Sequence, residues 1–191
     1  MQITLTLTGT RPMIQHNRRL ANPIDPYTRA LKQLTGKRKK TDEDIVDIMR
    51  IEARASCYET DDGLLGLPTE NVWRSLYDAA TAFKMGKDIK RALSATGDEV
   101  VPLLVGGEPV KVDPYLLEDG AIDYRSVKVG TNRVMRSRPI IANWSSTHTF
   151  ELFEDVIDKG DLVKVWERAG RLVGIGDYRP TYGTYTAEPA L

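Results

Sequence analysis

The first residues of the chain alternate between apolar and polar side chains. Ile3, Leu5 and Leu7 are separated by polar residues in the stretch QITLTLT. Because successive side chains of a strand point to opposite faces, this period of two predicts a strand with one buried face. We expect this strand to start at the very beginning of the chain.

The pattern then breaks down in a stretch rich in proline, asparagine and basic residues, which predicts an insertion of about residues 10–62 outside the sheet. Near its end, Thr41 and Asp44 have the spacing of a capping box, in which the threonine is the N-cap and the acid is the third helical residue. We therefore expect a helix from about residue 42 to Cys57. Glu52 interrupts its apolar stripe, so this helix should pack only partly.

Two further segments have the apolar spacing of helices. The first begins after LLGLP, where Thr69 can act as the N-cap, and the second covers about residues 161–173. Between them, from about residue 88 to residue 154, β-branched residues predict several short strands, including a β-rich insertion at about 97–124. The stretch YGTYTA, residues 182–187, predicts a closing strand. The apolar positions of the two helices are Val72, Leu76, Ala79, Ala80 and Phe83, and then Leu162, Val165, Trp166, Ala169, Leu172 and Val173.

The strong elements follow one another as strand, helix, strand, strand, helix and strand. This is the β-α-β-β-α-β order of a ferredoxin-like, or RRM-like, fold of the α+β class. We expect a single domain over residues 1–191, with an antiparallel sheet, both strong helices on one face of it, and the two insertions. We further expect Ile3, Leu5, Val72, Leu76, Val165 and Trp166 to share one core.

The composition limits the kinds of partner. The chain has 191 residues, of which 41% are hydrophobic, and its 27 basic residues balance 27 acidic ones, so any electrostatic partner must bind to a local patch. The single cysteine, Cys57, excludes an internal disulfide and indicates a reducing compartment. Without a run of about 18 apolar residues, the sequence predicts no membrane association and a cytoplasmic location.

Few residues carry a catalytic signature. His16 and His148 lie far apart in the sequence, and neither has a metal-ligand spacing with Cys57. The acidic residues at 42–44 are explained by helix capping, and the chain lacks a nucleophile elbow, a P-loop and a complete dinucleotide motif. We expect no catalytic residue, metal or cofactor. His16, beside Asn17 and Arg18, remains the best candidate for acid–base cleavage of RNA.

The stretch GIGDYRPTYGTYTA, residues 174–187, follows the last helix and combines glycines with an arginine and tyrosines. Three glycines, at 174, 176 and 183, permit positive backbone dihedrals. Arg179 can bind a phosphate, and Tyr178 or Tyr182 can stack on a base. The alternative is a helix C-cap at Gly174 followed by a turn whose tyrosines cover the edge of the core. We favour the binding loop.

Basic residues gather in three other places. Lys37 begins a run of four cations, Arg18 and Arg19 follow His16, and RVMRSRPII predicts a strand on which Arg136 and Arg138 share a face. Lys128 lies near them if RSVKVG forms a hairpin across GTN. The alternative is a solvated surface with ion pairs to acidic residues. The candidate nucleic-acid contacts are Arg18, Arg19, Lys37, Arg38, Lys39, Lys40, Lys128, Arg133, Arg136, Arg138, Tyr178, Arg179 and Tyr182.

The segment GLPTENVWRSLYDAATAF resembles the entry to the first helix in the RAMP superfamily, the RRM-like proteins that form the backbone of CRISPR effector complexes. GIGDYRPTYGTYTA is similar to the glycine-rich loop of that superfamily. Where the family usually has Gly-Ser after the proline, this chain has Thr69 and Glu70. The stretches HNRRLANPIDPYTRALKQLTGKRKKTDED and RVMRSRPIIANW resemble uncharacterised proteins of tailed phages.

These resemblances imply a protein that binds single-stranded DNA or RNA without cleaving it, encoded by a phage and acting in the host cytoplasm. They further imply assembly along the strand, as a homo-oligomer or as a subunit of a nucleoprotein complex. Two alternatives remain open. One is a metal-independent RNA-processing endonuclease on the same fold, and the other is a structural or interaction module whose basic loops are only surface.

Overall fold

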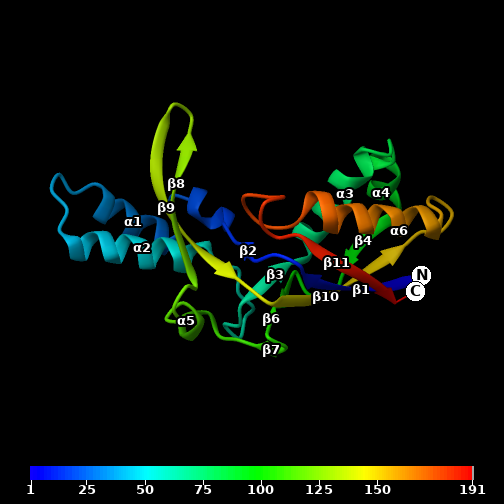
Figure 1. Cartoon of the computed structure of the whole chain (residues 1–191), viewed down its shortest axis with the longest axis horizontal. Coiled ribbons are helices and arrows are strands. Elements are labelled where there is room, and N and C mark those ends of the chain that lie inside the picture. Colours follow the sequence, from blue (N-terminus) through cyan, green and yellow to red (C-terminus); the bar gives the residue numbers. More distant parts are fainter. Residues whose placement is uncertain (191) are drawn as a thin grey trace.

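The computed structural model describes residues 1–190 as an elongated molecule with helices and antiparallel sheets, which confirms the α+β class (Figure 1). The strands are β1 (Gln2–Gly9), β2 (Met13–Ile14), β3 (Gly66–Pro68), β4 (Leu93–Thr96), β5 (Val100–Pro102), β6 (Leu104–Val105), β7 (Glu108–Pro109), β8 (Ile122–Val129), β9 (Asn132–Ile141), β10 (Trp144–Leu152) and β11 (Tyr185–Ala190). The helices are η1 (Arg18–Ala21), α1 (Pro26–Thr35), α2 (Asp42–Ser56), α3 (Thr69–Thr81), α4 (Gly86–Ala92), α5 (Val112–Tyr115), α6 (Lys159–Arg168) and the π-helical turn η2 (Ala169–Val173).

The main sheet has the strand order β11-β1-β10-β6-β7, and β4 also pairs with β10. Strand β1 lies inside this sheet, where it pairs antiparallel with both β10 and β11. Helix α3 lies in the chain between β1 and β4, and α6 lies between β10 and β11. The first and last strands of the chain are therefore neighbours in the sheet.

The alternation seen at the N-terminus produces one buried face. Ile3, Leu5 and Leu7 are at most 1% exposed, whereas the threonines between them point to the other face. That other face is polar, and Thr6 hydrogen-bonds to Thr147 of β10 at 3.1 Å between the hydroxyl oxygens. It offers no aromatic platform on β1, because every second residue of this strand is threonine or glutamine.

Helices α3 and α6 cover the buried face of the sheet (Figure 1). Most of their predicted apolar positions are buried together with the side chains of β1. Two of the predicted positions are exposed instead: Phe83, which lies beyond the end of α3, and Leu172. The six residues expected to share a core do belong to one buried cluster: Ile3, Leu5, Val72, Leu76, Val165 and Trp166. The predicted core shared by the first strand and both helices is thus confirmed.

At the opposite end of the molecule, β8 and β9 form a long hairpin that projects beside α1 and α2 (Figure 1). The pairing runs from Ile122 opposite Pro139 to Val129 opposite Asn132, with residues 130–131 as the turn. The hairpin expected across GTN is therefore confirmed. Strand β2 extends this sheet by pairing Met13 with Ile141.

Helices α1 and α4 form in segments where the residue pattern predicted irregular chain or strands. The stretch expected to be an irregular excursion contains α1, whose N-cap is Asp25 and whose first residue is Pro26. The side chain of Asp25 accepts hydrogen bonds from the backbone amides of Tyr27 and Thr28, and proline is favoured in the first turn of a helix. The prolines that predicted irregular chain therefore include one that starts a helix. Residues 86–92, expected at the start of the strand-rich region, form α4.

Other predicted boundaries move by a few residues. The capping box of Thr41 and Asp44 is present, and α2 ends at Ser56. Thr69, however, is the first residue of α3 and not its N-cap, because its hydroxyl donates instead to the carbonyl of Asp98. The closing strand begins at Tyr185 and not at residue 182, since residues 182–184 complete the glycine-rich loop.

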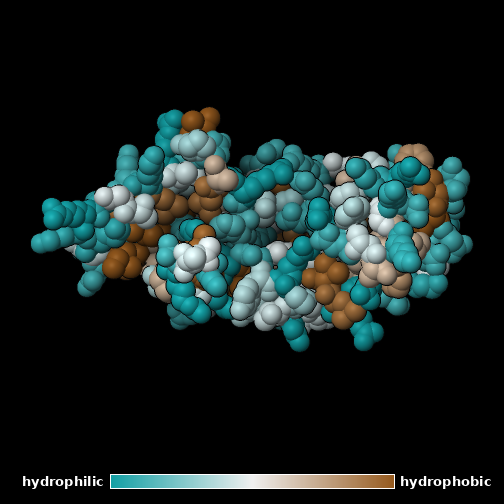
Figure 2. Space-filling view, turned by 90° about the horizontal axis from the view of Figure 1, so that it is seen from above, coloured by the Kyte–Doolittle hydropathy of each residue, from teal (hydrophilic) through white to brown (hydrophobic). Residues whose placement is uncertain are grey.

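Figure 2 shows a largely hydrophilic surface on which hydrophobic side chains form separate patches instead of one continuous face. Within residues 1–190, none of the helices combines the length and the apolar character needed to span a bilayer.

Candidate nucleic-acid-binding groove

Three neighbouring cavities form a row across the molecule. The hairpin cavity, of 550 Å³, lies against β8 and β9, the junction cavity of 230 Å³ follows it, and the helix cavity of 400 Å³ lies at the start of α3. His16 and Asp177 line both of the first two cavities. Tyr58, Asn71 and Arg74 line both of the last two. We call this row the groove.

The hairpin cavity is strongly cationic. Its charged lining consists of five basic side chains and one acidic side chain: Arg125, Lys128, Arg133, Arg136, Arg138 and Asp177. Lys128 and Arg133 face each other across the hairpin, and neither has an acidic partner within residues 1–190. These two cations are free to neutralise an anionic ligand.

The other arginines of β9 are held by acidic residues from distant parts of the chain. Arg136 donates a hydrogen bond to Glu52 of α2 at 2.7 Å, and the same buried carboxylate accepts a hydrogen bond from the backbone amide of Ser137. Arg138 is 3% exposed and donates to Asp177 at 2.6 Å and to Asp123 at 3.1 Å. Breaking such buried pairs is costly, so Arg138 is held in place and joins the hairpin to the closing loop.

Tyrosines of the closing loop surround the remaining cation of the hairpin cavity. Arg125 donates to Asp123 at 2.6 Å and to the hydroxyl of Tyr182 at 2.7 Å, and these bonds raise the pKa of Arg125 above its ordinary value. Its guanidinium lies 5.5 Å from the ring centre of Tyr178 and 4.8 Å from that of Tyr182. Tyr178 is 53% exposed, so it presents an accessible aromatic face beside the cationic patch.

The glycines of the closing loop allow its backbone to pack closely against neighbouring segments. Gly183 has a φ of 71°, and a Cβ there would lie 1.8 Å from the carbonyl oxygen of Ile175. A Cβ on Gly176 would lie 2.4 Å from the carbonyl oxygen of Ile14. Gly174 ends the last helix, as the C-cap alternative expected. The glycines therefore position the loop, whereas Tyr178 and Arg179 supply its accessible chemistry.

Arg179 lines the junction cavity with a half-buried side chain. It donates to Asp78 of α3 at 3.1 Å and to the carbonyl of Gly174 at 3.3 Å. Asp78 also pairs with Arg74, which lines the same cavity. One carboxylate thus holds two guanidinium groups at the middle of the groove.

His16 lies where the hairpin cavity meets the junction cavity, and its side chain is exposed. Partial desolvation lowers its pKa, the guanidinium groups of Arg136 and Arg138 lower it further, and Asp177 opposes them. The lowered pKa favours the neutral imidazole, which is the form that can accept a proton. Its backbone carbonyl lies 3.5 Å from the hydroxyl of Tyr58.

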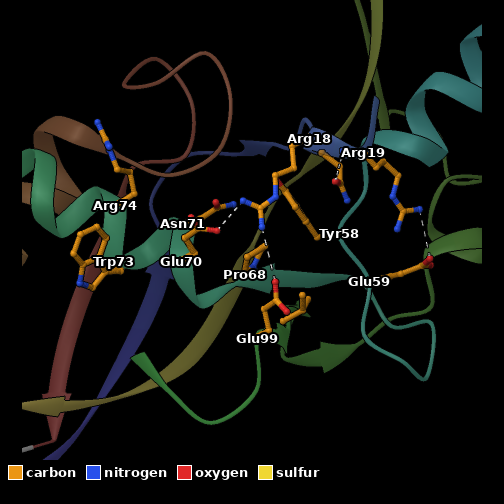
Figure 3. Close-up of a pocket in the computed structure, with 12 residues that line it drawn as sticks. Arg18, Arg19, Tyr58, Glu59, Pro68, Glu70, Asn71, Trp73, Arg74 and Glu99 are labelled. Carbon is orange, nitrogen blue, oxygen red and sulfur yellow. Dashed lines mark hydrogen bonds and ion pairs between the residues drawn. The ribbon is translucent and has the colours of Figure 1, made fainter. Parts of the chain in front are cut away.

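The helix cavity mixes acidic, basic and aromatic side chains (Figure 3). Arg18 extends across it and reaches Glu70 at 3.1 Å and Glu99 at 4.0 Å. Arg19 turns away to Glu59 at 3.9 Å. Glu70 thus lies within the wall of this cavity.

The basic run at 37–40 lies elsewhere. It connects α1 to α2 at the end of the molecule far from the main sheet (Figure 1), and it lines none of the three cavities. Lys37 donates to Asp44 at 2.5 Å, and Lys40 donates to the carbonyl of Lys37. Arg38 and Lys39 are exposed. The groove therefore brings together the other predicted contacts but not this run, and Tyr182 reaches it only through Arg125.

Several groove residues were not predicted from the sequence: Tyr58, Asn71, Trp73, Arg74 and Arg125. Arg74 and Asn71 lie on the polar face of a helix whose apolar stripe was recognised, so helical spacing could have identified their face. Tyr58 carried no signal, because its place in the groove depends on how the insertion folds back.

The described residues contain no group of three or more histidine, cysteine, aspartate or glutamate side chains arranged to hold a metal ion. Cys57 is fully buried, and desolvation raises the pKa of its thiol to about 12. His148 belongs to β10, and its side chain is buried in the core, where its ring nitrogens contact the hydroxyls of Thr69 at 3.0 Å and Ser146 at 2.9 Å. These groups have no access to the groove.

The chain matches no protein-family model, and it matches no curated protein sequence.

Proposed function

We propose that this protein binds single-stranded DNA or RNA along the groove without cleaving it. The observation that carries the proposal is the hairpin cavity, in which unpaired Lys128 and Arg133 lie beside the exposed ring of Tyr178. Cations that contact the phosphates and aromatic faces on which bases stack are the two requirements for binding a single strand. The molecule carries no net charge, so the cationic character is specific to this place.

At the level of the fold, we propose a single RAMP-like domain with a ferredoxin-like core. The strand order β11-β1-β10-β4 supports it, as do the antiparallel pairs and the placement of α3 and α6 between the strands. The groove runs beside this core and not across the polar face of its sheet. The insertion at about 10–62 supplies part of the groove wall through His16, Arg18 and Tyr58.

The test is a titration of a fluorescently labelled single strand of about 16 nucleotides, followed by anisotropy at about 50 mM and 200 mM salt. We expect binding that weakens as salt rises. In the variant with both Lys128→Ala and Arg133→Ala, the slope of log K against log salt should fall by about 1.4, since each phosphate contact on a single strand contributes about 0.7.

The matched control is Lys87→Ala, which removes an exposed cation from α4, outside the groove. It should bind like the wild type. If the control and the double variant lose the same affinity, binding is not located in the groove. If the wild type shows no salt-dependent binding of either DNA or RNA, the protein is an interaction module and the proposal is wrong.

A second candidate function is metal-independent cleavage of RNA. The observation that favours it is the position of His16, an exposed residue that lies between two cavities lined by arginines. Such a base can take the proton of a 2′-hydroxyl as that oxygen attacks the neighbouring phosphate, while water protonates the leaving 5′-oxygen. Incubation of end-labelled RNA with EDTA should then give fragments with the wild type and none with His16→Ala. Intact RNA in both samples would reject cleavage.

Assembly along the strand, a phage origin and a role in the host cytoplasm remain proposals. Assembly is tested by the mass of the complex formed on strands of increasing length, which should rise in steps of one 21.4 kDa chain.

A further inference from the structure

The helix cavity differs in chemistry from the rest of the groove. The hairpin cavity is cationic, whereas the lining of the helix cavity balances three acidic against three basic side chains, and Glu70 and Glu99 flank the guanidinium of Arg18 (Figure 3). A purely phosphate-binding surface would not carry these acids. We propose that this cavity receives one guanine base of the bound strand, whose Watson–Crick edge donates to Glu70. This inference rests on the proposed function.

The ion pairs that now occupy the cavity are weakly held. The side chains of Arg18, Glu70 and Glu99 are 74%, 63% and 84% exposed, and such exposed pairs contribute little stability. The two side chains of the Arg18–Glu70 pair suit the phosphate and the base of a nucleotide. A guanidinium binds phosphate, and a carboxylate accepts hydrogen bonds from a base. A bound nucleotide can therefore replace the Arg18–Glu70 pair at little cost.

Guanine fits a carboxylate better than the other bases do. It places two donors, N1–H and the N2 amino group, side by side on its Watson–Crick edge, so one carboxylate can accept both. Adenine and cytosine pair one amino donor with an acceptor nitrogen, and uracil places one donor between two acceptors. An acceptor that faces Glu70 is repelled, which disfavours these three bases.

The remaining walls suit a base that has been turned out of a stack. Tyr58 lies beside Arg18 and offers a ring face (Figure 3), and Asn71, which also lines the cavity, carries an amide that can donate to an acceptor such as guanine O6. The volume of 400 Å³ is within the range of about 300–1,000 Å³ for small-molecule sites. Because the junction cavity shares Tyr58 and Asn71, the strand can continue from here toward the hairpin.

The test compares labelled uridine oligomers that carry a single central guanosine, adenosine or cytidine with an all-uridine oligomer, at one low salt concentration. We expect the guanosine oligomer to bind about tenfold more tightly than the others, the ratio that one bidentate contact provides. Glu70→Gln should bring all four oligomers to the same affinity. The matched control, Glu118→Gln, changes an exposed acid outside the groove and should keep the preference.

Each result is decisive. Equal affinity of the wild type for all four oligomers, with salt-dependent binding intact, overturns the guanine site and leaves the proposed function standing. A guanosine preference that survives Glu70→Gln in a folded variant also overturns it, because the selecting group is then elsewhere. If no oligomer binds in a salt-dependent way, the proposed function itself fails.

Discussion

The buried imidazole of His148 should make the stability of this protein depend on pH in a defined window. His148 is completely buried, and desolvation lowers its pKa from 6.5 to about 4. The hydroxyl of Thr69 donates to the carbonyl of Asp98, so Nδ1 of His148 is the donor to Thr69 and Nε2 accepts from Ser146. The folded protein therefore holds a neutral imidazole with both nitrogens satisfied.

The direction of the pH dependence follows from the protonation of His148 in the folded and unfolded chains. Between pH 6.5 and pH 4 the unfolded chain binds a proton at His148 that the folded chain does not, so folding stability falls as the pH is lowered through this window. Each unit of pKa difference corresponds to about 1.4 kcal/mol. Between about pH 8 and pH 5, the loss should be about 2 kcal/mol.

The assay is urea unfolding at about pH 8 and pH 5, where most carboxylates stay ionised. The chain has only two histidines, so the His16→Ala background leaves His148 as the one imidazole that titrates. In that background we expect the full loss of about 2 kcal/mol, and adding His148→Gln should remove most of the pH dependence. A His16→Ala protein whose unfolding free energy changes by less than about 0.5 kcal/mol over this range would refute the reasoning.

Three further predictions concern the loops. Gly183→Ala should lower the melting temperature far more than Gly130→Ala, because a Cβ at 183 meets the carbonyl of Ile175 whereas one at 130 meets open space; equal shifts in a thermal melt would contradict the close packing. Trypsin should cut first at residues 37–40, which connect α1 to α2 in an exposed loop, and survival of that loop while other sites are nicked, seen by mass spectrometry, would count against its accessibility. Arg179→Ala should reduce the salt slope of single-strand binding by about 0.7, whereas Tyr182→Ala should weaken binding with little change of slope; a Tyr182→Ala variant that loses stability but binds normally would make the loop a lid over the core.

The sequence predicts the elements whose signals are local. Alternation identified β1, a capping box identified the start of α2, and the stretch GTN marked the turn of the β8–β9 hairpin. Helix α1 was missed because prolines suggested irregular chain, although Asp25 followed by Pro26 is itself a helix start. Local patterns of this kind are set by the nearest few residues, and so they can be read without a structure.

Whether a basic side chain is free or held in an ion pair depends on acidic residues far away in the chain. Arg136 donates a hydrogen bond to Glu52, which lies 84 residues away in the sequence. Arg138 donates one to Asp177, which lies 39 residues away. The spacing along β9 predicted that both arginines lie on one face of the strand. It could not show that Glu52 and Asp177 form ion pairs with them there. The groove likewise depends on the insertion folding back, which places His16 and Tyr58 opposite the closing loop. Tertiary pairing of this kind leaves no periodic signal.

The position of β1 inside the main sheet has a consequence for synthesis on the ribosome. Both neighbours of this strand come from late in the chain, since Thr6 contacts Thr147 across 141 residues and Thr8 contacts Thr186 across 178. Until those late strands emerge, Ile3, Leu5 and Leu7 have no sheet to join and stay open to other apolar surfaces. Pairing between such distant segments is slow. The apolar face of β1 should therefore be open to chaperones until residues 145–190 have been synthesised, although the finished core is well packed.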